Sequence, residues 1–170
     1  MPIIDAFLAE LDHEAATTRR VLDRVPDGRF DWHPHERSMT IGRLAGHIAE
    51  IFGWGSTVLT SDEFDVATAA QKGWVAFSAS DRAGLLDRFD RELAGFRQAA
   101  AAGVSDEHLR TPWSLRNGEH VAFTLPRAAA LRTFIFNHMI HHRGQLSVYL
   151  RLAGVPVPSI YGPSADEAPA

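Results

Sequence analysis

The sequence predicts an all-α protein, a four-helix bundle with a small β-hairpin excursion before the last helix. Three observations favour this fold. Four long stretches repeat apolar residues with the helical period of 3.6 residues. The chain has 170 residues, 45% of them hydrophobic, and no cysteine, so its stability must come from a hydrophobic core without disulfides. Finally, an Asn-Gly pair between two short apolar runs is a strong hairpin signal.

The first two helices are expected over residues 2–25 and 40–59, where one face of each helix is apolar. Pro26-Asp27-Gly28 ends the first helix. On the second helix, His47 lies at the flank of the apolar stripe, so its ring can face another helix, whereas Glu50 is expected to point away from it. The apolar positions are Ile4, Phe7, Leu8, Leu11, Ala15, Thr18, Leu22 and Val25 in the first helix, and Ile41, Leu44, Ala45, Ile48, Ile51, Phe52, Val58 and Leu59 in the second.

A third helix is expected over residues 81–101, and a long polar connection precedes it at residues 61–80. A connection of this length favours either a short helical turn or a lid, and its aromatic residues could equally plug one end of the bundle. The expected hairpin turns at Asn117-Gly118. The buried stripe of the third helix is expected to contain Leu85, Leu86, Phe89, Leu93 and Phe96.

The last helix is expected from Thr124 to Gly154. Thr124 can cap its amino end, and Pro126 suits the first turn, where a missing N–H costs nothing. Gly154, with prolines at 156 and 158, ends it. Its buried stripe is expected to contain Leu131, Ile135, His138, His142, Leu146, Tyr149 and Ala153.

Two histidines in this stripe indicate a metal site. His138 and His142 lie one turn apart, about 5–6 Å between Cβ atoms, so both can bind one ion. His141 lies at the edge, roughly 100° from the centre of the stripe, and is expected to be a flanking residue. His47 is the candidate third ligand. Three imidazoles without a thiolate or carboxylate leave the ion its full charge and open positions, which suits zinc, nickel or iron(II).

The sequence also excludes several kinds of site. Met139 follows His138, so the H-E-x-x-H pattern of zinc peptidases is missing, and no P-loop, G-x-S-x-G elbow or dinucleotide fingerprint occurs. His33 and His35 flank a proline in a loop and are expected to face solvent, with a fourth ligand from this loop as the alternative.

Charge and length set the expected partners and location. The net charge of −4, with mixed signs, argues against nucleic acid or an anionic membrane as the main partner. Because no signal peptide and no 18-residue apolar run occur, the protein is expected in the cytoplasm. We expect one domain over residues 1–163, followed by a flexible tail at residues 164–170.

Two motifs resemble those of the DinB/YfiT-like metalloenzyme superfamily. The last helix contains N-H-M-I-H-H-R-G-Q-L, and residues 30–50 read F-D-W-H-P-H-E-R-S-M-T-I-G-R-L-A-G-H-I-A-E. With Y-L-R-L-A-G-V-P-V-P after them, the resemblance covers essentially the whole chain. It implies a four-helix bundle, commonly a homodimer, that holds one divalent metal ion. By position, the ligands it implies are His47, His138 and His142.

The resemblance also implies an activity. Characterised members include thiol S-transferases that use bacillithiol or mycothiol, and a mycothiol-dependent maleylpyruvate isomerase. It therefore favours a transferase in which the metal lowers the pKa of a low-molecular-weight thiol, which then attacks a small-molecule electrophile. Arg143 and Tyr149 are weak candidates for catalytic roles, since Arg143 could instead tie helices together and Tyr149 could simply pack.

Three other functions remain open from the sequence. Metal-assisted hydrolysis would proceed without any thiol. A non-catalytic binding or sequestration protein would have a closed coordination sphere with a fourth protein ligand. A metal-free core would need a hydrogen-bond acceptor for each buried imidazole.

Overall fold

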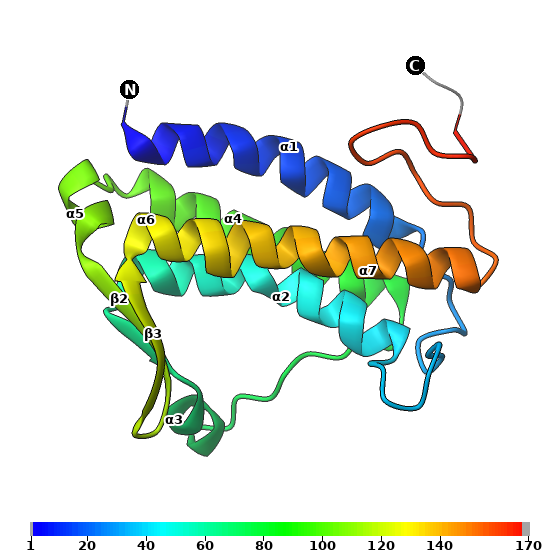
Figure 1. The fold of residues 1–170 in the computed structure, drawn as a ribbon, viewed down its shortest axis with the longest axis horizontal. Helices are drawn as coiled ribbons and strands as arrows, with labels where there is room; N and C mark the ends of the chain where they lie inside the picture. Colours follow the sequence, from blue (N-terminus) through cyan, green and yellow to red (C-terminus); the bar gives the residue numbers. More distant parts are fainter. Residues whose placement is uncertain (1, 168–170) are drawn as a thin grey trace.

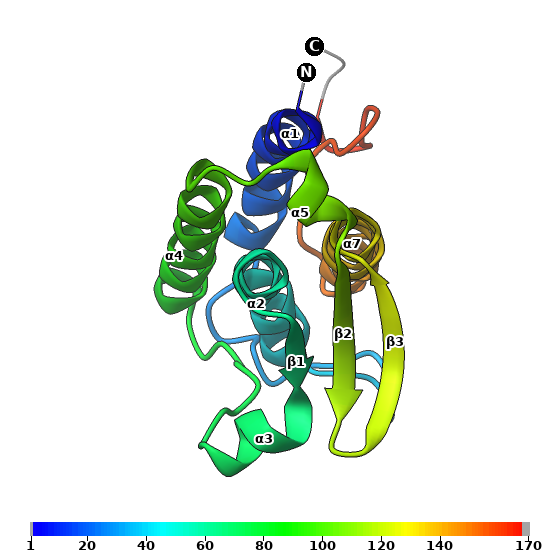
Figure 2. The ribbon, with the colours of Figure 1, turned by 90° about the vertical axis from the view of Figure 1, so that its left-hand side faces the viewer.

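The structure is a computed structural model that describes residues 2–167. Four long helical segments lie side by side around the core, close to where the apolar period places them (Figures 1 and 2). The Thr40 side chain caps the second of these segments by accepting a hydrogen bond from the backbone N–H of Arg43. Asp81 caps the third segment in the same way, by accepting one from the backbone N–H of Gly84. None of the described helices combines the length and apolar character that a membrane span requires. The segments are α1 (Ile3–Asp23), α2 (Ile41–Thr60), α4 (Arg82–Ala101) and a continuous run of α6 (Arg127–Ala130), η1 (Leu131–Asn137) and α7 (His138–Leu152).

A small three-stranded sheet projects from one end of the helices (Figure 2). The expected hairpin is confirmed: β2 (Pro112–Asn117) pairs antiparallel with β3 (His120–Pro126). Strand β1 (Glu63–Asp65) adds to β2 in parallel, so the strand order is β1-β2-β3. The prediction of an all-α protein is thus corrected: the chain is mostly helical but contains a sheet. A strand of three residues is too short to show a hydrophobic period of its own.

Gly118 is the first of the two loop residues in the hairpin turn, whereas in the usual Asn-Gly turn the glycine is the second. Asn117 pairs with His120, so the two loop residues are Gly118 and Glu119. Gly118 adopts a φ of 62°, which glycine tolerates without strain. Glycine at the first of two loop positions is typical of a type II′ turn, whose twist matches that of the strands.

The long connection before α4 is partly ordered as secondary structure. It contains β1 and the short helix α3 (Val66–Gln71). The short helical turn that the sequence offered as one alternative for this connection is therefore present. Trp74 packs edge-on against Phe64, with 6.0 Å between ring centroids. A second short helix, α5 (Asp106–Arg110), leads from α4 into the hairpin.

The last helix begins at Arg127, so the predicted start at Thr124 is wrong. Thr124 and Leu125 pair with Ser114 and Trp113 in the ladder of β2 and β3, and the Thr124 hydroxyl hydrogen-bonds that of Ser114 at 2.8 Å. Because Thr124 is paired in the strand ladder and its hydroxyl contacts Ser114, it does not cap the helix. Pro126 directly precedes the first helical residue.

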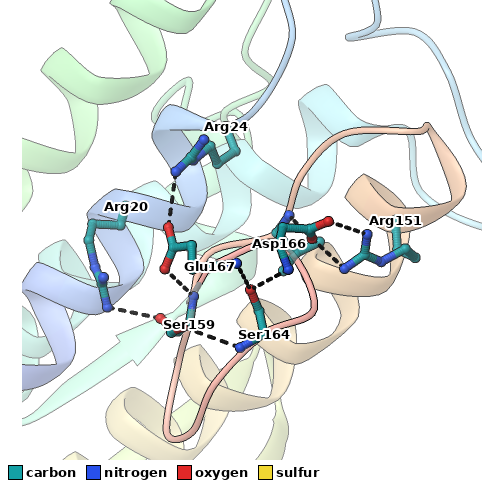
Figure 3. Close-up of polar contacts among 8 residues, drawn as sticks. Arg20, Arg24, Arg151, Ser159, Ser164, Asp166 and Glu167 are labelled. Carbon is teal, nitrogen blue, oxygen red and sulfur yellow. Dashed lines mark hydrogen bonds and ion pairs between the residues drawn. The ribbon is translucent and has the colours of Figure 1, made fainter. Parts of the chain in front are cut away.

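The chain after α7 folds back onto α1 and α7 (Figure 3). Asp166 accepts hydrogen bonds from the Arg151 guanidinium, and Glu167 accepts from Arg24. The backbone N–H of Ser159 also donates to Glu167, at 2.8 Å. The predicted flexible tail at 164–170 thus includes residues with defined contacts, while residues 168–170 lie outside the described part. The domain boundary at residue 163 stays a prediction.

Candidate metal centre

The structure brings together the three histidines that the sequence selected. His47 projects from α2 towards His138 and His142 on the first two turns of α7. One ring nitrogen from each lies within 4.8 Å of the others, and the Nε2 atoms of His47 and His138 are 3.3 Å apart. These residues come from two segments 91 positions apart in the chain. The site therefore forms only when α2 and α7 pack against each other.

The other ring nitrogen of each histidine faces an oxygen. His47 Nδ1 lies 3.4 Å from the Glu50 carboxylate, and His138 Nδ1 lies 3.2 Å from the Phe134 carbonyl. His142 Nδ1 lies 2.7 Å from the Gln145 amide oxygen. Because these oxygens accept hydrogen bonds, each Nδ1 carries the proton and each Nε2 presents its lone pair. This is the tautomer that binds a metal through Nε2.

The distance between the Nε2 atoms of His47 and His138 fits a shared divalent ion. Two imidazole nitrogens that each lie about 2.0–2.1 Å from one tetrahedral ion are about 3.4 Å apart. The observed 3.3 Å between the Nε2 atoms of His47 and His138 matches this spacing. Two lone pairs facing each other at that distance would otherwise repel, so the donor set is suited to a shared cation.

Burial favours the neutral form of His138 and His142, which is the form that binds a metal. Desolvation, followed by the neighbouring charges of His142 and His47, lowers the pKa of His138 to about 4. Desolvation also lowers the pKa of His142. Metals bind deprotonated imidazole, so no proton has to be displaced from these rings at neutral pH.

A π-helical segment directly precedes the two candidate ligands on the last helix. Leu131–Asn137 form η1, and a π-helix has a longer turn than an α-helix. Four residues of the predicted stripe are buried: Leu131, Ile135, His142 and Leu146. Phe136, Met139 and Arg143 are also buried, while Tyr149 is only half-buried. His138 keeps its place facing α2 but is half-exposed on its other side.

Glu50 is the functional residue that sequence reasoning missed. It was expected to point away from His47, but its side chain is 1% exposed and lies beside the His47 ring. Glu50 Oε2 accepts a hydrogen bond from the Phe77 backbone N–H at 3.1 Å. The Arg43 guanidinium lies 3.4 Å from Glu50 Oε1, the oxygen that faces His47. A carboxylate thus lies beside one candidate ligand without belonging to the three-histidine group. The signal was the H-x-x-E spacing, which puts both side chains on neighbouring helical positions.

Aromatic rings and an open cavity flank the cluster. Trp54 stacks on Phe134 at 5.3 Å between ring centroids, and Phe134 stacks on His138 at 5.8 Å. On the outer side, a cavity of about 600 Å³ lies between β3 and the last helix. It is lined by Phe123, Leu125, Thr133, Phe134, Asn137, His138 and His141. His141 is thus a flanking residue at the mouth of the site.

The two weak catalytic candidates make contacts away from the cavity. Arg143 is 1% exposed and forms an ion pair with Glu14 on α1 at 2.7 Å, which is the helix-tying role that the sequence left open. Its guanidinium also lies over the Tyr161 ring. Tyr149 packs edge-on against Trp32, with 6.1 Å between ring centroids.

The two loop histidines are exposed, as expected. His33 Nδ1 lies 2.8 Å from the His35 carbonyl oxygen. Within residues 2–167, neither is part of the three-histidine group.

Comparison with known proteins decides the family. A model of the DinB family matches residues 3–169. The chain belongs to the DinB family. The uncharacterized protein YrdA of Bacillus subtilis is 30% identical to this DinB protein over 173 residues, which cover 96% of this chain and 91% of YrdA.

Solved structures of DinB-like proteins share the fold. One from Bacillus cereus superposes with a TM-score of 0.68 at 24% identity, covering 92% of this chain and 97% of its own. Another from Bacillus subtilis gives a TM-score of 0.65 at 21% identity, covering 93% and 96%. At this identity the likeness supports the arrangement of helices and strands in this DinB protein, and its chemistry has to be argued from its own residues.

Proposed function

We propose that this DinB protein is a metal-dependent transferase, in which an ion held by His47, His138 and His142 activates a small thiol towards an electrophile. The observation that carries this proposal is the convergence of three imidazole nitrogens, one from each histidine, beside an open cavity. Zinc, nickel and iron(II) all take four or more ligands. Three imidazoles therefore leave at least one position for a substrate atom.

The chain's own residues prepare the site for this chemistry. Glu50, Gln145 and the Phe134 carbonyl fix the imidazole tautomers. The stacked rings of Trp54 and Phe134 cover one side of the cluster. A bound divalent cation supplies Lewis acidity, which lowers the pKa of a thiol and makes its sulfur nucleophilic at neutral pH.

The proposed transfer is balanced without a redox partner. The thiol loses its proton to solvent, its sulfur forms a bond to an electrophilic carbon, and the leaving group departs with the electron pair of the bond that breaks. Because the chain contains no cysteine, the sulfur comes from a co-substrate. The products are a thioether, the leaving-group anion and a proton.

The test is a thiol-dependent assay with a halogenated bimane dye as the electrophile. Protein loaded separately with zinc, nickel or iron(II) is mixed with bacillithiol, mycothiol or glutathione. We expect thioether formation that requires both metal and thiol and that falls at least 100-fold in His142→Ala. The matched control is His120→Ala, which removes an exposed imidazole outside the three-histidine group and the cavity lining and should retain most of the activity.

Two outcomes would contradict the transferase. Turnover of an ester or amide without any thiol would indicate metal-assisted hydrolysis. Stoichiometric metal without turnover for any pair of thiol and electrophile would indicate a binding protein. The homodimer implied by the family likeness stays a prediction, and sedimentation equilibrium of the full chain measures it.

A further inference from the structure

We propose that the cavity beside His138 binds the uncharged, apolar part of the electrophilic substrate, and that Phe123 and Leu125 set the size it accepts. This inference rests on the proposed function, because only the transfer reaction makes the ligand an electrophile. It goes further by naming the chemistry of the substrate and the residues that select it.

The lining of the cavity favours an uncharged ligand. Its walls are the half-buried side chains of Phe123 and Leu125 on β3 and of Phe134 on η1. Among the residues that the structure describes, no arginine, lysine, aspartate or glutamate lines it. In the metal-free protein a charged group entering this space would lose hydration without gaining a counter-charge, whereas an aromatic or branched aliphatic group would bury apolar surface.

The walls are supported from behind, so the cavity is preformed. Trp113 is fully buried, and its ring centroid lies 6.0 Å from that of Phe123 and 5.8 Å from that of Phe134. Leu125 is held in the ladder opposite Trp113. A volume of about 600 Å³ is in the range of small-molecule sites, which are about 300–1,000 Å³ and mostly apolar.

The cavity also has the right position for a reacting partner. His138 lines it with one side of its ring and faces His47 with the other. A molecule seated between β3 and η1 therefore lies next to the open side of the three-histidine cluster. The exposed side chains of Thr133, Asn137 and His141 form a polar rim, where a neutral polar end of the ligand can remain hydrated.

The test measures binding directly by calorimetry, using the full chain with and without zinc. The probes are two matched series, neutral 4-alkylbenzyl alcohols and anionic 4-alkylbenzenesulfonates. We expect the alcohols to bind at least tenfold more tightly than the sulfonates to the metal-free protein, and to bind the zinc-loaded protein as well. Each added methylene should raise the affinity about three- to fourfold until the cavity is full.

Variants of one strand locate the binding. Leu125→Trp fills the cavity and should weaken binding of the alcohols at least tenfold, while Leu125→Ala should move the best-bound alcohol to a longer alkyl chain. Ala122→Trp is the control, because Ala122 is exposed on the same strand and does not line the cavity. Leu125→Ala keeps the test decisive if the larger side chain prevents folding.

The inference is overturned if the sulfonates bind the metal-free protein as tightly as the alcohols do, or if neither series binds at millimolar concentration. It is also overturned if Leu125→Trp and Ala122→Trp change the affinity equally. The expected binding pattern in a protein that transfers no thiol supports the apolar site but overturns the proposed function. The two failures are therefore distinguishable.

Discussion

At the scale of single residues, the oxygen facing each Nδ1 matters as much as the histidine itself. The spacing of His138 and His142 was sufficient to predict the pair, because positions four apart share a helix face. The role of Glu50 was missed although it is only three positions from His47. The period predicted a polar residue pointing outwards, but its oxygens accept from the Phe77 backbone and lie beside the His47 ring. Such contacts depend on how a loop covers the helix.

Replacing Glu50 should weaken metal binding without removing a ligand. Glu50→Gln takes away the negative charge that supports His47, and losing such a partner typically lowers metal affinity about 10–100-fold. Competition with a fluorescent chelator measures the change. Glu119→Gln, an exposed glutamate in the hairpin turn, is the matched control and should bind metal like the original protein.

The depressed pKa of His138 predicts how acid affects the metal-free protein. The folded pKa is about 4, below the ordinary value of 6.5, so between these pH values the unfolded chain binds more protons than the folded one. The free energy of unfolding should therefore fall as the pH falls from about 6.5 to 4. Urea unfolding of the chelated protein across this range measures the slope, and His138→Leu should make it shallower. An unchanged slope in that variant would contradict this origin.

At the scale of elements, the helices were easier to predict than the places where they begin and change register. Caps and apolar periods located α2 and α4, because these signals are local. The start of the last helix depended on pairing with β2, a partner distant in sequence. The π segment η1 also escaped prediction, since a stripe drawn with 3.6 residues per turn assumes an unbroken α-helix. In the structure Arg143 is buried, whereas Tyr149, which the stripe included, is only half-buried.

The ion pair that joins α1 to α7 should be important for stability. Glu14 and Arg143 have side chains 6% and 1% exposed, so Glu14→Gln leaves a buried guanidinium without its carboxylate. Breaking such a pair costs about 3–5 kcal/mol, and urea denaturation measures it. The exposed pair of Arg19 and Asp90 is the control, and Asp90→Asn should cost about 0–1 kcal/mol.

The same pair can be tested by removing both charges. The double variant Glu14→Leu with Arg143→Met should be closer to the original stability than Glu14→Gln, because no unpaired charge remains buried. If the double variant is the less stable of the two, the charges contribute more than their desolvation costs, and this reasoning would be wrong.

At the scale of the whole molecule, the site depends on packing between α2 and α7, and the fold in turn should depend on the metal. An ion that binds only the folded chain stabilises it by about 2.7 kcal/mol at a free concentration 100 times the Kd. For a chain of this size that raises the Tm by about 5–10 °C. Thermal unfolding before and after chelation measures the shift. His142→Ala should show no such difference, whereas His141→Ala should behave like the original protein.

The most direct test of the central claim is element analysis of the full chain purified without a tag or chelator. The account predicts one divalent ion per chain, retained in His141→Ala and lost in His47→Ala, His138→Ala and His142→Ala. Each variant has to be folded by circular dichroism for the comparison to count. A folded protein that takes up no metal at neutral pH, or that keeps its ion when any of the three proposed ligands is removed, would contradict the account.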